Sequence, residues 1–267
     1  MPLLTLTNIH KTFEKGTINE NPVLRGLDLE IEQGDFISVI GGNGAGKSTL
    51  MNSIAGVVEI DDGDILLDGQ SIRKSSVADR SKSISRVFQD PRMGTATNLT
   101  LEENMAIAYR RGKKRSFFKR SITEEERQIF KGALEHLGLG LENRMKTDAN
   151  FLSGGQRQAL TLSMATLVRP KVLLLDEHTA ALDPKTSDMV MNLTKKVVEE
   201  QQLTTLMVTH NMEHAIEYGN RLIMLYHGKI VVDVKGEEKE NLTVAQLMDL
   251  FHKNSGQVLN DDALVLG

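Results

Sequence analysis

The chain has 267 residues and a mass of 29.6 kDa, so it can bury a large apolar core without disulfide or metal crosslinks. It contains no cysteine, which excludes disulfide scaffolds, iron–sulfur clusters, cysteine-ligated zinc and thiol nucleophiles. The net charge is −4, but seven basic residues and no acid fall in Arg110–Arg120, so the rest of the chain carries −11 and repels a nucleic-acid backbone.

The first third of the chain is predicted to be rich in strands, because apolar and polar residues alternate there. A strand at Asp35–Ile40 ends in a glycine cluster, and a helix is expected from about Gly46 to Ala55. The other expected strands are Leu3–Ile9, Leu27–Glu32, Gly63–Gly69 and Ile84–Phe88.

The apolar period becomes helical between Leu99 and Leu167. A capping box of Thr123 and Glu126 begins one helix, and another begins near Ser153. Strands and helices then alternate, with strands at 171–175, 204–209 and 221–226 and helices at 185–201 and 211–218. Buried strands that alternate with helices predict an α/β fold with a parallel sheet.

A glycine-rich segment between the strand at Asp35–Ile40 and the following helix fits the pattern of a phosphate-binding loop. Its glycines allow positive φ, so that several amides can face one anion, and the helix adds its positive N-terminal end. Lys47 is expected to contact the β- and γ-phosphates, and the Ser48 hydroxyl to bind Mg²⁺. The alternative is a glycine-rich turn with a surface lysine. The loop comprises Gly41, Gly42, Asn43, Gly44, Ala45, Gly46, Lys47, Ser48 and Thr49.

Two acids directly follow the apolar run Val172–Leu175. They are therefore expected at the carboxyl end of a buried strand, where open α/β sheets bind ligands. Asp176 is expected to bind Mg²⁺, and Glu177 to orient or deprotonate a water. The alternative is a pair of acids that merely ends a strand at the surface, which the phosphate loop elsewhere in the chain disfavours.

Gly154 and Gly155 stand in the first turn of the helix that Ser153 and Gln156 begin as a capping box. Each glycine costs a helix up to about 1 kcal/mol against alanine. We interpret them as leaving the backbone amides open to a bulky anion. Capping explains the start of the helix by itself, but it does not explain the glycines.

Leu-Ser-Gly-Gly-Gln at 152–156, between a phosphate loop and an Asp-Glu strand, resembles the signature of ABC-type ATPases. The resemblance covers about Leu3 to Val232. It implies one ABC-type ATPase domain over residues 1–267, with a phosphate-loop NTPase core of mostly parallel sheet and an antiparallel β subdomain at 1–88 and 169–235. It further implies an inserted α-helical subdomain at 89–168 and a C-terminal helix and tail at 236–267.

The resemblance also implies two ATP molecules held in a head-to-tail dimer, formed by two copies of this chain or with a second ATPase subunit. The ATP-binding residues it implies are Phe13, Gly41, Asn43, Gly44, Ala45, Gly46, Lys47, Ser48 and Thr49, with Ser153, Gly154, Gly155 and Gln156 acting in trans on the other subunit's nucleotide. The catalytic residues it implies are Lys47, Gln89, Glu177 and His210. The Mg²⁺ ligands it implies are Ser48, Gln89 and Asp176, and Asp183 is implied in communication between the two sites. Without the resemblance, Phe13 would be interpreted as a core residue and His210 as a solvated strand end.

His178 departs from the family, which commonly has proline after the Asp-Glu pair. The run Asp-Glu-His-Thr-Ala-Ala at 176–181, with Gln-Asp-Pro at 89–91 and Gly-Thr-Ala at 94–96, resembles a subgroup of bacterial importer ATPases. That subgroup is associated with small organic solutes such as amino acids.

We therefore expect an ATPase that converts ATP and water to ADP and phosphate and serves an ABC importer. No apolar run is long enough to span a bilayer, so we expect a peripheral protein on the cytoplasmic face of the plasma membrane. The expected partners are integral permease subunits, which contact the helical insertion and the region near Gln89, and an extracytoplasmic solute-binding protein. Nucleic acid is not expected as a partner.

Two alternatives belong to other classes. An ABC-type ATPase that acts on nucleic acid or ribosomes is disfavoured by the single cassette, the short helical insertion and the acidic body. A non-hydrolysing nucleotide-binding regulator is disfavoured by Glu177 and His210. Arg110–Arg120, with two interleaved phenylalanines, is either a solvated loop or a contact for anionic lipid or the permease.

Overall fold

The computed structural model describes residues 1–113 and 122–255. These residues form two compact units. Unit 1 comprises Met1–Arg80 and the chain from Leu203 onward, and unit 2 comprises Ser81–Gln202. Residues 114–121 of the basic segment and the tail from residue 256 lie outside the described residues.

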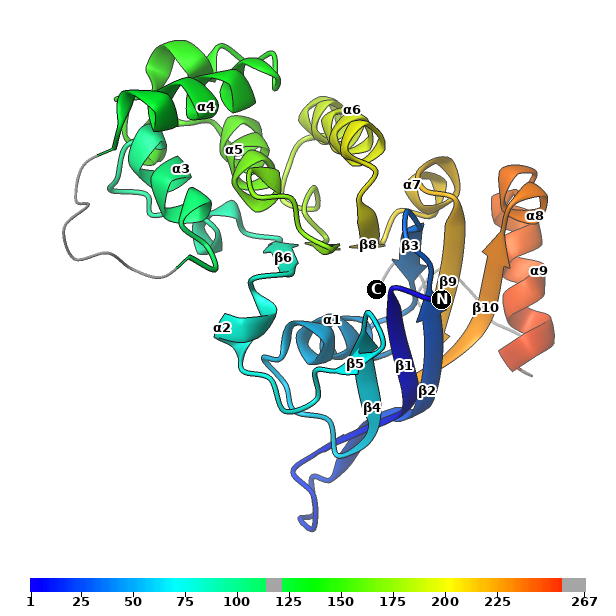
Figure 1. Ribbon diagram of the computed structural model, residues 1–267. Helices are drawn as coiled ribbons and strands as arrows, with labels where there is room; N and C mark the ends of the chain where they lie inside the picture. Colours follow the sequence, from blue (N-terminus) through cyan, green and yellow to red (C-terminus); the bar gives the residue numbers. More distant parts are fainter. Residues whose placement is uncertain (114–121, 256–267) are drawn as a thin grey trace. The chain divides into compact units, whose positions relative to one another are not determined.

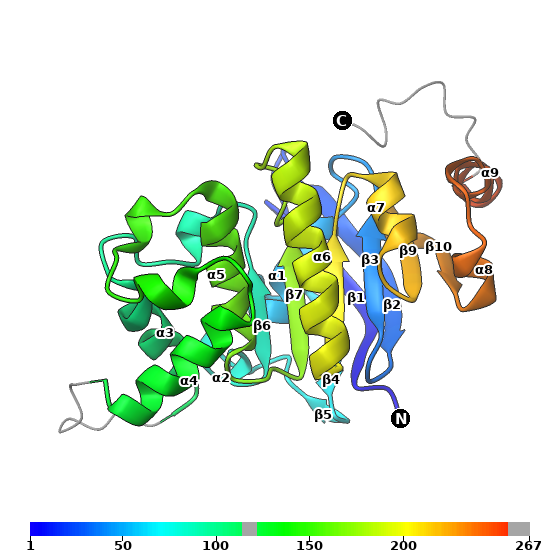
Figure 2. The same ribbon diagram turned by 90° about the horizontal axis from the view of Figure 1, so that it is seen from above.

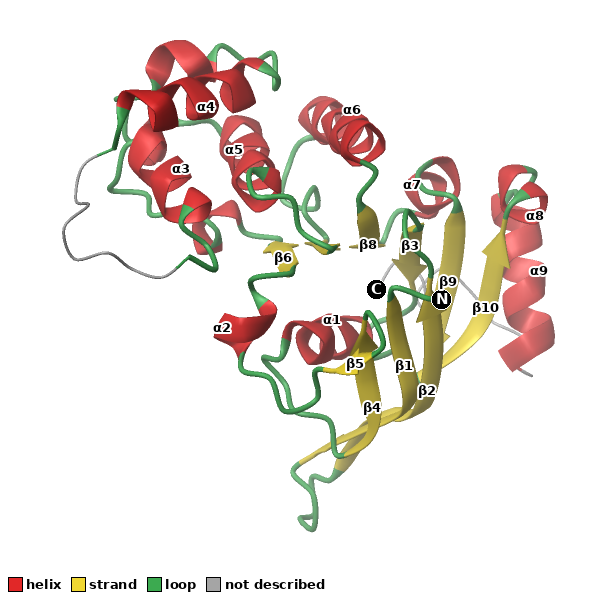
Figure 3. Cartoon of the chain, viewed as in Figure 1, coloured by secondary structure: helices red, strands yellow, loops and turns green. Residues whose placement is uncertain are grey.

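Unit 1 contains most of the strands (Figures 1 and 3). One sheet is antiparallel and has the strand order β2-β1-β4-β5. In the second group of strands the order is β10-β9-β3-β8, with β3 parallel to both β8 and β9, and β10 antiparallel to β9. The strands of unit 1 are β1 (Leu4–Phe13), β2 (Asn21–Ile31), β3 (Phe36–Ile40), β4 (Asp62–Leu67), β5 (Gln70–Ser71), β8 (Thr204–Val208), β9 (Arg221–Tyr226) and β10 (Lys229–Lys235). Its helices are α1 (Lys47–Ala55), α2 (Val77–Arg80), α7 (Met212–Glu217), α8 (Glu237–Glu240) and α9 (Val244–Ser255).

The strands in the middle of the parallel group are buried along their whole length, as expected of strands covered on both faces. All five residues of β3 and all five of β8 are buried. In β2, residues 27–31 instead alternate strictly between buried and exposed positions, and in β1 the buried residues Leu4, Leu6 and Ile9 are separated by partly or fully exposed ones. The predicted switch between alternating and continuous apolar strands is therefore confirmed.

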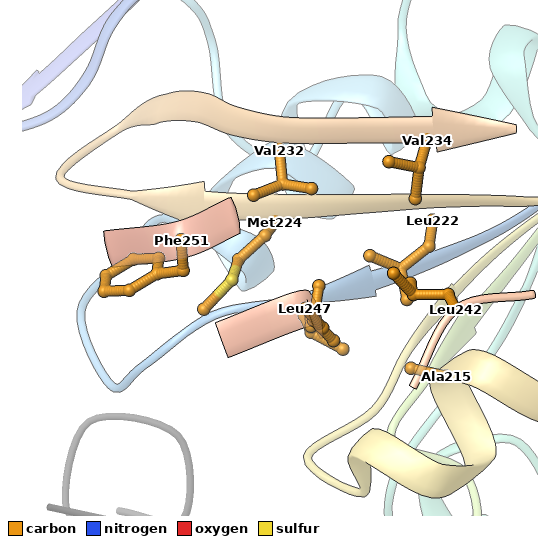
Figure 4. Close-up of a cluster of buried hydrophobic side chains, with 9 residues drawn as sticks. Ala215, Leu222, Met224, Val232, Val234, Leu242, Leu247 and Phe251 are labelled. Carbon is orange, nitrogen blue, oxygen red and sulfur yellow. The ribbon is translucent and has the colours of Figure 1, made fainter. Parts of the chain in front are cut away.

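Helix α9 packs its apolar face onto the β9–β10 hairpin (Figure 4). Phe251, 1% exposed, stands edge-on to the ring of Tyr226 with centroids 5.1 Å apart. The rest of this cluster comes from β3, α7, β9, β10, the loop before α9 and α9 itself: Ile40, Ala215, Leu222, Met224, Val232, Val234, Leu242 and Leu247. The C-terminal helix is thus part of the core of unit 1.

Phe251→Ala is expected to lower the free energy of unfolding by about 3–5 kcal/mol, because it leaves a ring-sized void in this cluster. Phe151→Ala is the matched control, since that ring is 68% exposed and its loss should change stability by no more than about 0.5 kcal/mol. Urea denaturation followed by circular dichroism measures both. Equal effects of the two substitutions would contradict the packing described for α9.

Unit 2 combines two parallel strands with a group of helices. Figure 2 shows α3, α4 and α5 gathered together, and these helices contact one another. Strand β6 is parallel to β7, with Ile84 opposite Val172 and Val87 opposite Leu175. Its elements are β6 (Ile84–Val87), α3 (Leu101–Tyr109), α4 (Glu124–Glu135), α5 (Gly154–Thr166), β7 (Val172–Asp176) and α6 (Pro184–Gln201), with 3-10 turns at Pro91–Met93, Leu141–Arg144 and Ala149–Phe151.

Both predicted capping boxes are present in unit 2. The Thr123 hydroxyl accepts from the amide of Glu126 at 3.2 Å, and the Glu126 carboxylate accepts from the amide of Thr123 at 3.0 Å. Ser153 and Gln156 form the same reciprocal pair at the start of α5. The bounds 89–168 for a separate helical subdomain stay a prediction.

Within residues 1–113 and 122–255, none of the helices combines the length and the apolar character that crossing a bilayer requires.

Candidate functional site

The phosphate loop begins at the carboxyl end of β3. Gly41 has φ +149°, and a Cβ there would lie 2.3 Å from the carbonyl oxygen of Leu225, so no other residue fits without moving the backbone. Gly46, at φ +105°, begins α1 without any side-chain cap. No side-chain cap hydrogen bond is made at this helix start, and no acidic residue stands in the first turn to repel an anion.

Lys47 lies inside the loop that precedes it. Its side chain is buried, with the residue 6% exposed, and its ammonium donates to the carbonyl oxygens of Gly41 at 2.6 Å and Gly42 at 3.3 Å. A positive charge held at this point, with backbone amides beside it, forms a cradle for phosphate oxygens. This arrangement contradicts the alternative of a surface lysine.

His210 belongs to the same unit and emerges at the same edge as the loop. Val39 of β3 pairs with Val208 of the parallel strand β8, and Gly41 and His210 each follow two residues later. His210 is half-buried. The structure thus brings His210 and the phosphate loop to one edge of unit 1.

Phe13 ends β1 and is 38% exposed, which contradicts its interpretation as a core residue. The ammonium of Lys11 lies 5.4 Å from the centre of the ring. An exposed aromatic ring is what stacking on adenine requires, and that role stays a prediction.

Unit 2 presents a second set of predicted residues at the edge where β6 and β7 end. Val87 pairs with Leu175, so Gln89 and Glu177, each two residues further on, leave the strands at the same end. Gln89 is exposed and Glu177 half-buried. Glu177 has φ +48°, a conformation uncommon for a residue with a side chain.

The structure adds Arg86, a residue that the sequence analysis missed. Asp176 forms an ion pair with Arg86 of the neighbouring strand, and both side chains are largely buried, with 15% and 14% exposed. The Arg86 guanidinium also lies 4.8 Å from the ring centre of Phe88. The available signal was an arginine in a strand whose other residues, Ile84, Ser85 and Val87, are all buried. Its partner could not be inferred because strand pairing depends on the fold.

The residues predicted to bind Mg²⁺ offer hydroxyl, amide and carboxylate oxygens, the ligands this ion prefers. Ser48 and Gln89 are exposed, and Asp176 has two carboxylate oxygens, of which Oδ2 accepts from Arg86. The donor set therefore fits Mg²⁺ held mainly by phosphate. Across the two described ranges no three His, Asp or Glu side chains gather to form a site made of protein alone, and a phosphate-held ion needs no such cluster.

The two glycines of the signature differ in their surroundings. Gly154 is exposed, and a Cβ there would meet only the end of Leu182, at 3.2 Å. Gly155 is buried, and a Cβ there would lie 2.3 Å from the methyl group of Thr186 on α6. The packing of α5 on α6 thus explains Gly155, whereas only Gly154 is left for the anion interpretation.

Gly155→Ala is expected to destabilise the protein, by roughly 1–3 kcal/mol from overpacking, while Gly154→Ala leaves stability within about 1 kcal/mol. Thermal unfolding distinguishes the two. If Gly154 faces the other subunit's nucleotide, Gly154→Ala weakens ATP-dependent dimers without loss of stability. Equal melting temperatures for both variants would contradict the packing explanation.

Asp183 caps the N-terminus of α6. Its carboxylate accepts from the amide of Thr186 at 3.1 Å, and Pro184 occupies the first helical position. Hydrogen bonds from Thr186, side chain and backbone, hold the pKa of Asp183 below its ordinary value. Asp183 thus has a structural role as the cap of α6, and its role in communication between the two sites stays a prediction.

Comparisons with known proteins support the same family. Residues 24–180 match the family model described as ABC transporter. A tyrosine transport ATP-binding protein of Clostridioides difficile is 46% identical over 93% of this chain and 98% of its own length. A phosphonates import ATP-binding protein of Lactobacillus gasseri is 33% identical over 98% of each chain.

Solved structures indicate the same family as the related sequences. A dimeric ATP-binding cassette in a post-hydrolysis state, bound to ADP and Pi, matches with a TM-score of 0.73 and 30% identity, over 87% of this chain and 98% of that one. The cbiO1 protein of Clostridium perfringens, part of the ABC transporter complex cbiONQ, matches with a TM-score of 0.76 and 25% identity, over 94% and 95%.

The predicted fold class, a phosphate-loop α/β core with an antiparallel β part and helices, is thereby confirmed, and so is the predicted activity class of ATPase. The chain belongs to the ABC transporter family, as an ATP-binding and ATP-hydrolysing subunit.

Proposed function

We propose that this chain energises the import of an amino acid, with tyrosine as the first solute to test. The supporting observation is the 46% identity to a tyrosine transport ATP-binding protein, over nearly the full length of both chains. Relatives named for phosphonate import are 33% to 36% identical, which makes phosphonates the second candidate. The relatives' names concern transport, which favours this proposal over work on nucleic acid or ribosomes.

In the proposed reaction the loop at 41–49 binds the phosphates of ATP. The uncapped amides at the start of α1 and the Lys47 ammonium offset the phosphate charge. Phe13 stacks on the adenine. Mg²⁺, held by Ser48, Asp176 and Gln89, supplies further neutralisation of phosphate charge when bound.

Hydrolysis requires a base and a contact to the terminal phosphate. Glu177 accepts a proton from the attacking water, and His210 donates to an oxygen of the γ-phosphate. Gln89 orients the water. Each of these side chains stands at the carboxyl end of a strand, the usual location for ligand contacts in an α/β sheet.

The assembly we propose is a head-to-tail dimer, with Ser153, Gly154, Gly155 and Gln156 acting on the other subunit's ATP and Asp183 linking the two sites. ATP binding closes the dimer and hydrolysis reopens it, which drives integral permease subunits between their two faces. The permease contacts residues in 89–168, on the cytoplasmic face of the membrane, and an extracytoplasmic binding protein delivers the solute. The relative solved as a dimer, and the relative described as part of a transporter complex, support this assembly.

Uptake by cells tests the solute. Deleting the gene in its own organism should abolish uptake of labelled tyrosine, and plasmid-borne wild type should restore it where Glu177→Gln does not. Uptake of labelled 2-aminoethylphosphonate is measured in parallel. Loss of phosphonate uptake with normal tyrosine uptake would move the proposal to phosphonates, and two unchanged rates would overturn it.

A further inference from the structure

His178 is the one motif residue whose departure from the family pattern the proposed function does not use. It directly follows Glu177 and is 2% exposed. Its Nε2 lies 3.0 Å from the hydroxyl of Thr194 on α6, and Thr194 is fully buried. Because His178 is the next residue in the chain, this buried contact restrains the proposed base Glu177 through the backbone.

The direction of this hydrogen bond follows from a second hydrogen bond that the Thr194 hydroxyl makes. The Thr194 hydroxyl donates its single proton to the carbonyl oxygen of Val190, at 2.8 Å. It can therefore only accept from His178, so the imidazole carries its proton on Nε2 and donates it to Thr194. The ring is thereby fixed to the middle of α6.

The backbone at Glu177 explains why histidine suits this position. Glu177 has φ +48°, and its carbonyl oxygen accepts from the amide of Ala180 at 2.9 Å, which closes a tight turn. A proline at 178 would push the preceding residue towards extended conformations. A histidine at 178 permits the left-handed conformation of Glu177. Its hydrogen bond to Thr194 on α6 restrains the turn in place of a proline ring.

We infer that His178, through Thr194, is a positioning residue that holds the Glu177 carboxylate in its left-handed turn for proton transfer from water. The inference rests on the proposed role of Glu177. It also ties the turn to the helix that Asp183 caps, so that the proposed base and Asp183 are held by the same element.

Thr194→Val tests the inference, because it keeps the shape of the side chain and removes the acceptor. Displacing a reacting group by about 1 Å can cost up to about 10²-fold in rate, so we expect kcat to fall roughly 10- to 100-fold while the KM for ATP changes less than about twofold. Thr194→Ser, which keeps the hydroxyl, should restore most of kcat. Thr166→Val is the matched control, since that buried hydroxyl also donates to a helix carbonyl, Leu162 O at 2.9 Å, and it should leave kcat unchanged.

Two further measurements distinguish positioning from a structural defect and from failure of the proposed function. In long-range ¹H–¹⁵N spectra His178, assigned through His178→Gln, should show the Nε2–H tautomer with a slowly exchanging proton, and that protection should be lost in Thr194→Val. Adding Thr194→Val to Glu177→Gln should cause no further loss, because no base remains to be positioned.

A kcat for Thr194→Val equal to that of Thr166→Val, with Glu177→Gln inactive, would overturn the positioning role alone. Near-normal turnover in Glu177→Gln would overturn both the role of Glu177 and the inference built on it.

Discussion

Glu177→Gln is expected to reduce ATP turnover by about 10²- to 10⁴-fold, the usual contribution of a general base, while ATP still binds. The amide keeps the size of the side chain and cannot accept the proton of water. Glu177 leaves β7 beside Gln89 at the carboxyl edge of two parallel strands, and its turn is held from α6. Phosphate release measures turnover, and a fluorescent ATP analogue measures binding.

Glu125→Gln is the matched control for this change, because Glu125 is exposed on α4 and its neutralisation should leave turnover within twofold. The slow variant should also accumulate ATP-bound dimers, detectable by light scattering. A strict monomer at high protein and ATP concentration would contradict the proposed action of residues 153–156 in trans.

Lys47→Met is expected to weaken ATP binding by about 10- to 150-fold. A hydrogen bond to a charged group contributes about 1.5–3 kcal/mol, and each 1.4 kcal/mol is tenfold in affinity. The substitution also removes the donor that the carbonyl oxygens of Gly41 and Gly42 share, so the loop loses two hydrogen bonds along with the charge. Titration with ATP, by calorimetry or fluorescence, measures the change.

Lys229→Met serves as the control for loss of one positive charge, since Lys229 is exposed in the same unit. Circular dichroism checks that both variants are folded. An unchanged ATP affinity for Lys47→Met would remove this residue from the phosphate site.

Local sequence patterns determine much of the fold. The mostly apolar strand β3, the continuous apolar run of β7 and the reciprocal capping boxes at Thr123 and Ser153 lie where the sequence predicts them. These features depend on neighbours within a few residues, so period and spacing suffice to predict them. Strand bounds differ more: β2 begins at Asn21, six residues before its predicted start, because pairing with β1 extends it.

The candidate residues are also predictable from sequence, because phosphate binding demands particular residue types at fixed spacing. The surroundings of these residues cannot be predicted from the sequence. The sequence pattern attributes Gly155 to anion binding, whereas the structure shows that Thr186 leaves no space for a side chain there.

The sequence by itself determined the family, the nucleotide chemistry and the residues expected to contact the nucleotide, since those reside in contiguous motifs. Only the tertiary structure decided that Arg86 pairs with Asp176 and that His178 is bound to Thr194. The members of each pair stand 90 and 16 positions apart along the chain. The physical reason is that a buried charge or imidazole must find its partner in space, and the packing of whole strands and helices, not any local pattern, determines which partner is near.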